Sequence, residues 1–394
     1  MGNEFMYNHI HIVAFNVPYP PNYGGVIDVF YKIKALAKWG VNIHLHTYQY
    51  GRASAEELEP YCEKVYYYKR NVFANPFGGR LPYIIKSRSA PKLKERLMAD
   101  DAPVLYEGLH TCAFLEDLAK IGKPQFVRMH NIEHLYYHNL AKVESNPFKK
   151  LFFEQEAKKL RHFQRKMTKA SGIAAISPAD NSYLRVKFDN TFYLPVFHQN
   201  EKVHHATEEG DFALYHGNLG VGENNEAALF LVNEVFSQLK TPFIIAGMTP
   251  SVKLQKSVAE HSHIRLKENL DTYSITKLVR NARINIMPTF QDTGIKLKLI
   301  NVLFNGKHCL VNEKMVKNTG LEKLCHIAND AEEMKAAVRD LMEKPYSLQD
   351  YEDRVGVMTQ AFNNLKNAGI LVEKLKLKHQ VPKALQPELS QEEV

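Results

Sequence analysis

The sequence predicts an α/β protein made of two parallel-sheet domains. Its 394 residues exceed what one ordinary hydrophobic core serves, so two domains are the default expectation. An apolar strand-like run at 9–15 leads through a Pro/Gly-rich loop to a helix-period segment at 26–40 and a second apolar run at 41–48. The same strand–loop–helix order starts again with an apolar run at 212–218 and a helix-period segment at 225–239. Strands joined through helices pair in parallel, so each half predicts its own parallel sheet.

The remaining segments repeat this alternation of strand and helix patterns. The polar stretch 198–211, rich in His and Glu, is typical of a linker. We therefore expect two Rossmann-like domains facing a central cleft, 1–197 and 212–359, with C-terminal helices at about 360–380 packing back on the first domain. Further strands are expected at 64–69, 103–108, 124–131, 172–177, 242–248, 263–269 and 283–290, and further helices at 89–99, 110–122, 148–170, 272–282, 349–378 and, after a short strand, within 324–344.

The bulk composition is that of a soluble globular protein, with 45% hydrophobic and 24% charged residues. The formal charge of +8 fits an anionic ligand, an anionic membrane surface or nucleic acid, and is also common in soluble enzymes. The basic residues are spread along the chain and the Tyr clusters suit packing, which disfavours nucleic acid. No C-x-x-C pair occurs among the four cysteines, so we expect free, mostly structural thiols and no zinc cluster.

The start of the chain runs directly into a strand, and no apolar run approaches the ~20 residues that span a bilayer. A cytoplasmic protein is therefore expected, with peripheral contact at the inner membrane face left open.

Adjacent glycines precede the first predicted helix. In open parallel sheets, ligands bind beyond the carboxyl ends of the strands, where loops and helix N-termini meet. Gly24 and Gly25 would let backbone N–H groups approach a ligand closely, and the helix dipole favours an anion there. The pair matches neither the G-x-G-x-x-G fingerprint nor a P-loop, so tight-turn geometry and ligand contact both stay open.

A polar cluster follows the strand expected at 124–131. His130, Asn131, Glu133 and His134 crowd one strand end, where imidazole and carboxylate can orient a sugar hydroxyl or carry a proton. His130 and His134 could supply two metal ligands, but Glu133 does not follow His130 as in H-E-x-x-H, and about three ligands are needed. A metal site is therefore disfavoured.

A glycine and two lysines mark the helix start that follows the run 283–290. Gly294 permits a close backbone approach, and Lys296 and Lys298 add positive charge beside free N–H groups, which suits a diphosphate. Lysines two residues apart cannot share a helical face, so one of them is expected to reach the ligand. The alternative is a solvated lysine face over a buried apolar stripe.

The first strand–helix loop of the second domain, 215–227, is also rich in glycine. Its Gly217 and Asn218 are expected to contact phosphate or sugar, and Asn224 or Asn225 suits the helix N-cap.

Several of these segments resemble glycosyltransferase family 4, the retaining GT-B enzymes. The most specific is DTGIKLKLINVLFNGKHCLV at 292–311, which is similar to the donor-site stretch GTGIKLK-x-x-E-A-L-x-x-G-x-P-V-V of one branch. The resemblance covers roughly residues 9–345. Its other parts are the amino-terminal βαβ unit at 18–48, the acceptor-side His segment at 128–141, the long helix with its following strand and S-x-x-D turn at 153–184, and the start of the donor-binding domain at 215–239.

The resemblance implies a GT-B fold, a nucleotide sugar held mainly by the C-terminal domain, an acceptor on the N-terminal side, and no cofactor or essential metal. Carried over residue by residue, it puts Gly24 and Gly25 near the donor diphosphate, His130 near the transferred sugar and Lys296 near the phosphates. His130 and Lys296 are thus the catalytic candidates. The other implied residues are Asn131 and Glu133 on the acceptor side, and Gly217, Asn218, Thr293, Gly294, Ile295, Lys298 and Asn301 on the donor side.

The chain departs from the family pattern in three places. Many members carry Glu-x7-Glu, whose second Glu bonds the donor ribose, but Thr293 and Asn301 stand at these positions. Asn makes a weaker bond to a hydroxyl than a carboxylate does. The Arg and Lys that many members have after the first donor-domain strand are missing from 216–227, so Lys296 would supply more of the charge. The Pro after the closing Gly is replaced in 306–311.

We therefore expect a metal-independent hexosyl- or related transferase acting with retention. It would move a sugar from a nucleotide-diphosphate donor to a glycan or lipid-linked acceptor in cell-surface polysaccharide synthesis. Two alternatives stay open: a GT-B-like protein that binds but no longer catalyses, which Asn301 allows, and an enzyme like the GT-B sugar-nucleotide 2-epimerases, which needs no acceptor.

Overall fold

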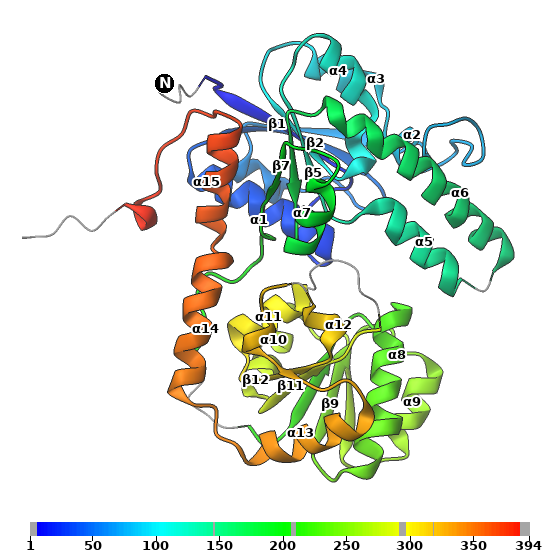
Figure 1. Ribbon diagram of the computed structural model, residues 1–394, viewed down its shortest axis with the longest axis vertical. Coiled ribbons are helices and arrows are strands. Elements are labelled where there is room, and N and C mark those ends of the chain that lie inside the picture. Colours follow the sequence, from blue (N-terminus) through cyan, green and yellow to red (C-terminus); the bar gives the residue numbers. More distant parts are fainter. Residues whose placement is uncertain (1–5, 145, 206–209, 291–296, 318, 387–394) are drawn as a thin grey trace, which may run out of the picture. The chain divides into compact units, whose positions relative to one another are not determined.

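The chain folds into two compact units, each built on a parallel β-sheet (Figure 1). The computed structural model describes residues 6–144, 146–205, 210–290, 297–317 and 319–386. Unit 1 comprises Met1–Gln199 and Asn363–Val394, and unit 2 comprises Asn200–Phe362. The predicted fold class, two parallel-sheet α/β domains, is confirmed.

The sheet of unit 1 has seven parallel strands in the order β3-β2-β1-β4-β5-β6-β7. The strand order reverses between β1 and β4, the kind of position at which open α/β sheets bind ligands. The strands are β1 (His9–Ala14), β2 (Asn42–Gln49), β3 (Lys64–Lys69), β4 (Val104–Glu107), β5 (Gln125–Met129), β6 (Gly172–Ala175) and β7 (Thr191–Tyr193).

Two hydrophobic cores cover the faces of this sheet, because side chains alternate between the faces along each strand. Ile10 and Ile12 of β1 pack in a core with residues of α1 and α15, while Val13 packs on the other face with residues of α3 and α6. The helices of unit 1 are α1 (Gly24–Lys38), α2 (Tyr83–Lys86), α3 (Pro91–Leu97), α4 (Leu115–Lys120), α5 (Glu133–Val143), α6 (Pro147–Gln164), α7 (Pro178–Arg185) and α15 (Asn364–Lys374).

The sheet of unit 2 has six parallel strands in the order β10-β9-β8-β11-β12-β13. Its strands are β8 (Ala213–His216), β9 (Phe243–Gly247), β10 (Ile264–Glu268), β11 (Ile284–Met287), β12 (His308–Val311) and β13 (His326–Ile327). Its helices are α8 (Gly222–Phe230), α9 (Val252–Ala259), α10 (Thr272–Asn281), α11 (Leu297–Asn305), α12 (Glu313–Val316), α13 (Ala331–Glu343) and α14 (Leu348–Ala361).

Several element boundaries differ from the sequence prediction. The helix expected at 225–239 starts at Gly222 and gives way to a π turn at Leu231–Val235. Its N-cap is Val221, and Asn224 and Asn225, the expected N-caps, lie inside the helix, where the Asn224 side chain donates to the carbonyl of Asn218. Similarly, the helix expected at 110–122 is a 3₁₀ segment, Leu109–Phe114, followed by α4.

The last helix of the chain, α15, packs against the first helix, α1 (Figure 1). Trp39, the C-cap of α1, donates its indole N–H to the carbonyl of Leu365 at 2.8 Å. A Cβ on Gly369 would lie 2.8 Å from the Trp39 ring, so glycine permits this close approach. None of the helices in the described residues is long and apolar enough to cross a membrane.

Candidate functional site

The first loop of unit 1 brings Gly25 and His130 to the same aromatic ring. Phe15 follows β1, and a Cβ on Gly25 would lie 2.6 Å from its Cζ atom, so glycine lets α1 start against the ring. The Phe15 ring centroid lies 5.7 Å from that of His130. Tyr23, the N-cap of α1, makes no side-chain capping bond, so no N-cap side chain satisfies the first-turn N–H groups at Gly24 and Gly25.

His130 is oriented by a buried carboxylate. Its Nε2 atom lies 2.9 Å from Oε2 of Glu107, and an ionised carboxylate only accepts, so Nε2 carries the proton and donates it. The Nδ1 atom faces Asp28 Oδ2 at 3.8 Å. The His130 side chain is 8% exposed, whereas both carboxylates are fully buried. His130 therefore forms the accessible edge of a buried charged group.

That group is a buried ion cluster of four side chains. Lys32 Nζ lies 2.9 Å from Asp28 and 2.7 Å from Glu107, joining α1 to β4. Arg128 of β5 contacts both Asp28 oxygens, at 2.9 and 3.1 Å. Two carboxylates and two permanent cations balance, which is the condition for burying charge at tolerable cost.

The cations of this cluster keep its carboxylates ionised. Burial alone would raise the pKa of Asp28, but Arg128 and then Lys32 outweigh it and the pKa lies well below its usual range. For Glu107, Lys32 and the His130 hydrogen bond likewise outweigh burial and lower the pKa. Oxygens of Asp28 and Glu107 and a nitrogen of His130 lie within 4.8 Å of one another, as metal ligands would. Lys32 already neutralises these carboxylates, so a metal ion would have to displace its ammonium group.

Glu133 and His110 lie behind this edge, and sequence reasoning missed His110. Oε1 of Glu133 lies 3.9 Å from Nδ1 of His110, and neither atom has a hydrogen-bond partner among the described residues. Burial raises the pKa of Glu133 to about 8, against the Asn131 hydrogen bond and Arg88, so the carboxyl is mostly protonated at neutral pH. The sequence feature that could have indicated His110 is Gly108, two residues earlier. This glycine directly follows β4 and adopts a φ of 79°.

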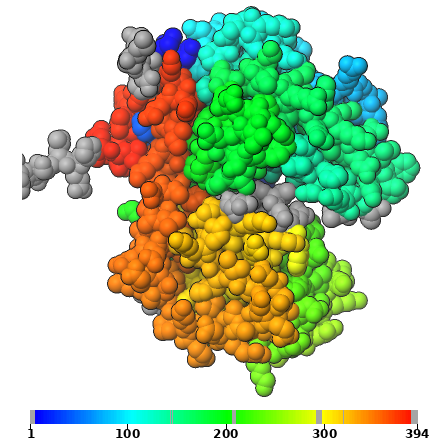
Figure 2. Space-filling view, viewed as in Figure 1, coloured from blue at the N-terminus to red at the C-terminus, as the bar shows by residue number. Residues whose placement is uncertain are grey.

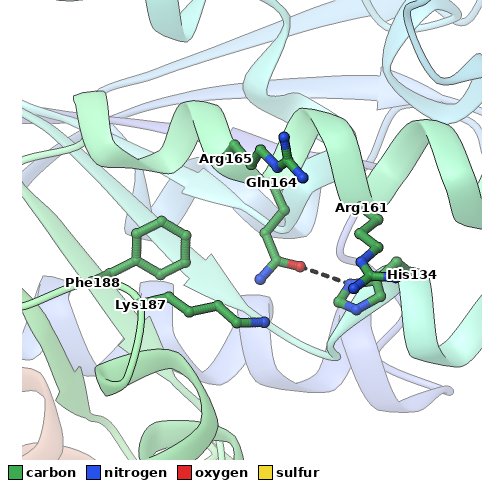
Figure 3. A pocket seen from close by; sticks show the side chains of 6 residues that line it. All are labelled: His134, Arg161, Gln164, Arg165, Lys187 and Phe188. Carbon is green, nitrogen blue, oxygen red and sulfur yellow. Dashed lines mark hydrogen bonds between the residues drawn. The ribbon is translucent and has the colours of Figure 1, made fainter.

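A small basic pocket opens beside α5, α6 and α7 (Figure 3). It holds about 180 Å³. His134 forms its inner wall, with Nδ1 2.8 Å from Gln164 Oε1. Burial lowers the pKa of His134, helped by the neighbouring Lys187, so the imidazole stays neutral among cations. The lining residues, three of them cationic, are His134, Arg161, Gln164, Arg165, Lys187 and Phe188.

In unit 2, the first loop converges on Lys298. Asn224 donates to the carbonyl of Asn218 at 3.0 Å and accepts from Lys298 Nζ at 3.0 Å. Lys298 Nζ also lies 5.3 Å from the ring centroid of Tyr215. A Cβ on Gly217 would lie 3.2 Å from Asn224. Three of the predicted donor residues, Gly217, Asn218 and Lys298, are thus brought to one loop.

His216, at the carboxyl end of β8, was not predicted. It is 6% exposed, and its Nδ1 atom has no hydrogen-bond partner among the described residues. Burial lowers its pKa to about 4, with Lys298 adding to the effect. Just after the neighbouring strand, β11, the backbone of Thr289 bonds the side chain of Asn312, and the Thr289 hydroxyl donates to Glu223. Among the described residues, the strand ends of unit 2 are therefore held by neutral amides and a hydroxyl, joined by the carboxylate of Glu223 and the ammonium group of Lys298.

Asn301 takes part in a chain of side-chain amides. Its Oδ1 atom accepts from Asn305 Nδ2 at 3.1 Å, and Asn305 Oδ1 accepts from Arg280 at 2.9 Å. The other predicted donor residues, Thr293, Gly294, Ile295 and Lys296, lie outside the described residues.

Comparisons with known proteins identify the fold. No family model matches the chain. An uncharacterized 44.6 kDa protein in the cps region of Klebsiella pneumoniae is 25% identical over 348 residues, covering 82% of this chain and 87% of that protein.

Solved structures of similar fold include three glycosyltransferase-type proteins. Anabaena Alr3699/HepE in complex with UDP and glucose has a TM-score of 0.62 and 10% identity, covering 93% of this chain and 98% of its own. A UDP-glucosyltransferase from Polygonum tinctorium has a TM-score of 0.60 and 11% identity, covering 95% of this chain and 100% of its own. Acinetobacter baumannii MurG has a TM-score of 0.53 and 13% identity, covering 94% of this chain and 99% of its own. The chain therefore has the GT-B fold, as the resemblance implied.

Proposed function

We propose that the chain is a retaining glycosyltransferase of family 4. It would move a sugar from a nucleotide-diphosphate donor to a glycan or lipid-linked acceptor in cell-surface polysaccharide synthesis. The relative in a cps region supports the polysaccharide part of this proposal.

The observation that carries the proposal is a feature shared by both units of this GT-B fold. In each sheet, the helix after the first strand starts with glycine, at Gly24 in α1 and Gly222 in α8, and its N-cap makes no side-chain bond. Helix N-termini of this kind present N–H groups and a positive dipole end to an anion. A donor diphosphate is an anion of the right charge to use them.

Unit 2 would hold the donor, and unit 1 the acceptor and the transferred sugar. Lys298, joined to the Gly217–Asn218 loop through Asn224, would neutralise charge that develops on the departing diphosphate. His130, held by Glu107, would hydrogen-bond the transferred sugar. In same-face attack, the acceptor hydroxyl forms the new glycosidic bond as the sugar–phosphate bond breaks, and its proton passes to the leaving phosphate oxygen. No metal ion enters this scheme.

A nucleotide-sugar panel tests the proposal. Thermal shifts with UDP, GDP, ADP and CMP should single out one nucleotide, because a ligand that binds only the folded state raises its stability. The corresponding sugar donor should then be hydrolysed or transferred, with the anomeric configuration kept and with activity persisting in EDTA. If no nucleotide stabilises the chain and no donor is turned over, the proposal fails.

A binding protein without catalysis is favoured by one observation. The Asn301 amide bonds Asn305 within its own helix and lacks the charge of the usual acid. Asn301→Glu separates the two functions. If activity appears only in the variant, the native chain is a binding protein; if the native chain is active and the variant is weaker, Asn301 is a working substitute. A new nucleotide sugar formed without acceptor would instead indicate an epimerase.

The basic pocket suits an anionic group on the acceptor, such as the phosphate of a lipid-linked sugar. Lys187 and the two arginines supply the charge, and the volume of about 180 Å³ is comparable with a small anion and its water. Lys187→Gln and Arg161→Gln should raise KM for a phosphorylated acceptor several-fold and leave donor hydrolysis unchanged. Equal effects on both reactions would contradict this assignment.

Two exposed phenylalanines on unit 1 support peripheral membrane contact. Phe73 is 96% exposed and Phe148, at the start of α6, is 80% exposed. Phe77 contacts Phe152 ring to ring, and Lys159 donates to the carbonyl of Pro76 at 2.7 Å, so the loop and the helix form one surface. Figure 2 shows the surface of α5 and α6 on one side of unit 1. Exposed lysines at 149 and 150 add positive charge.

Aromatic side chains beside lysines match an anionic lipid surface, because the rings insert at the interface while the lysines meet the headgroups. Vesicles of anionic lipid should co-sediment with the chain, and vesicles of neutral lipid should not. A Phe73→Ser/Phe148→Ser variant should lose most of this binding and keep its unfolding temperature. Undiminished binding would show that another surface is responsible.

A further inference from the structure

A histidine cluster lies at the amino-terminal edge of the unit 1 sheet. His9 and His11 lie two apart on β1, so both point to one face, and His11 pairs in register with His44 of β2. Asp100, in the loop before β4, reaches the same place. The candidate sugar site follows the opposite end of β1, whose six residues span on the order of 15–20 Å. The histidine cluster is therefore a separate feature.

The four side chains converge on one point. Nε2 of His9 and Nε2 of His11 each lie 3.1 Å from Oδ2 of Asp100. The ring of His44 lies with its centroid 4.1 Å from that of His9. One ligand atom from each residue lies within 4.8 Å of the other three. Tetrahedral zinc, with bonds of about 2.0–2.1 Å, separates neighbouring ligand atoms by roughly 3.3 Å, so the more distant ligand atoms would move together by up to about 1.5 Å on binding.

One buried imidazole nitrogen of this cluster, Nε2 of His44, has no hydrogen-bond partner among the described residues. Glu63 Oε1 lies 3.6 Å from it. Buried polar atoms are normally paired, and a cation bound at this cluster would explain the exception.

A second layer of hydrogen bonds orients His11. Its Nδ1 atom lies 2.9 Å from Nε2 of His46, whose Nδ1 lies 2.9 Å from the hydroxyl of Tyr68. Arg96 donates to the same hydroxyl at 2.9 Å. A histidine that binds metal through one nitrogen usually donates the other N–H to such a partner, which fixes the ring.

One neighbour opposes a cation. Lys123 Nζ donates to Asp100 Oδ1 at 2.9 Å and to its backbone carbonyl at 2.9 Å. This contact leaves Oδ2 for a metal ion but places a positive charge close to it. The carboxylate of Glu63, on the other side of His44, partly offsets that charge.

We propose that these four side chains form a structural site for a divalent transition-metal ion, with zinc as the best match. Three imidazoles with one carboxylate suit zinc better than magnesium or calcium, which prefer oxygen ligands. Four protein ligands close the coordination shell, so the ion has no open position for catalysis. It fastens β1 to β2 and to the loop before β4. This proposal revises the sequence prediction of no zinc cluster and does not depend on the proposed sugar transfer. The ligands are His9, His11, His44 and Asp100.

Metal titration of the full chain tests the site. After treatment with a chelator, the chain should bind one zinc ion by calorimetry, give the strong visible absorption of tetrahedral cobalt, and gain thermal stability with zinc but not with magnesium. His9→Ala/His44→Ala should lose all three responses. His261→Ala is the matched control, since the chain has 18 histidines that could bind metal weakly.

Two further variants keep the test decisive. His9→Ala alone removes a side chain that is 21% exposed, so it should fold normally while binding zinc at least tenfold more weakly. Lys123→Gln should bind zinc more tightly, because it removes the opposing charge. Wild-type binding no tighter than that of His9→Ala, or a cobalt spectrum unchanged in the double variant, would overturn the proposal.

Discussion

The two units share a parallel-sheet plan but hold their strand ends in different ways. In unit 1, the buried ion cluster of Asp28, Lys32, Glu107 and Arg128 fixes His130 with permanent charges. In the described part of unit 2, neutral amides and a hydroxyl form most of the network, and two charged groups, Glu223 and Lys298, join it.

The two networks should respond differently when one of their side chains is removed. Buried charges that are paired and balanced orient a neighbouring side chain strongly, but removing one of them leaves another without compensation. Neutral amide networks cost less to rearrange, because removing one partner leaves no buried charge uncompensated. Unit 1 therefore holds His130 with paired buried charges, whereas the described strand ends of unit 2 rely more on neutral groups.

The largest expected effect comes from breaking the ion cluster. Asp28→Asn leaves Arg128 and Lys32 buried without their shared carboxylate, which should cost about 3–5 kcal/mol of unfolding free energy in urea. Asp271→Asn in unit 2 is the control, because this exposed N-cap works with either residue and should change little. Comparable losses in both variants would remove the contrast between the units.

Two buried titratable side chains, one in each unit, should make folding stability depend on pH in opposite directions. In unit 1, Glu133 has a raised pKa of about 8, so the folded chain keeps a proton that the unfolded chain releases, and stability falls as pH rises from 4.5 to 8. In unit 2, His216 has a lowered pKa of about 4, so stability falls as pH drops from 6.5 to 4.

Substituting each group should remove its contribution to the pH dependence of stability, roughly 5 kcal/mol for Glu133 and roughly 3 kcal/mol for His216. Glu133→Gln should gain stability relative to wild type between pH 5 and pH 8, and His216→Gln should gain between pH 7 and pH 4. Unfolding free energies measured across pH give both slopes. Slopes of the same sign would refute the assignment.

The third comparison is catalytic. Lys298→Gln should lower kcat/KM roughly 100-fold, as expected when one preorganised charge is lost from a developing anion, with little change in unfolding temperature. His130→Gln should lower both activity and stability, because it also disturbs Glu107. Lys256→Gln, an exposed lysine of α9, controls for the loss of charge. A Lys298 variant with full activity would exclude it from donor binding.

The smallest effect compares two glycines at helix starts. Gly25→Ala forces the Phe15 ring to move, since the new Cβ would lie 2.6 Å from it, and should cost about 1 kcal/mol and some activity. Gly222→Ala meets nothing within 4 Å and should be neutral or slightly stabilising. Equal melting temperatures for both variants would mean that the ring yields freely.

The fold was predictable because hydrophobic periodicity reports which face of each element is buried. The strand-end positions of Gly25, His130 and Gly217 followed from the same pattern, since parallel strands place their following loops at one edge. The convergence of Lys298 with Asn224 was not predictable, because it depends on how α11 lies against the first turn of α8.

The buried ion cluster escaped prediction for a similar reason. Lys32 lies in YKIKALAK, which looks like an ordinary amphipathic helix with solvated lysines. Its burial depends on Glu107, 75 positions further along, facing the same turn of α1. The alternating histidines of HIHIVAF and NIHLHTY likewise indicated strands, while the register that joins them lies in the three-dimensional pairing.

The seam between α1 and α15 has a consequence for how the chain is made. Residues 368–377 complete a core begun by the first strand, so during synthesis unit 1 stays unfinished until all of unit 2 has emerged. Trp39, the single tryptophan of the chain, lies at this seam with its indole bonded to Leu365. Its fluorescence should therefore change when α15 packs against α1 and completes the core of unit 1.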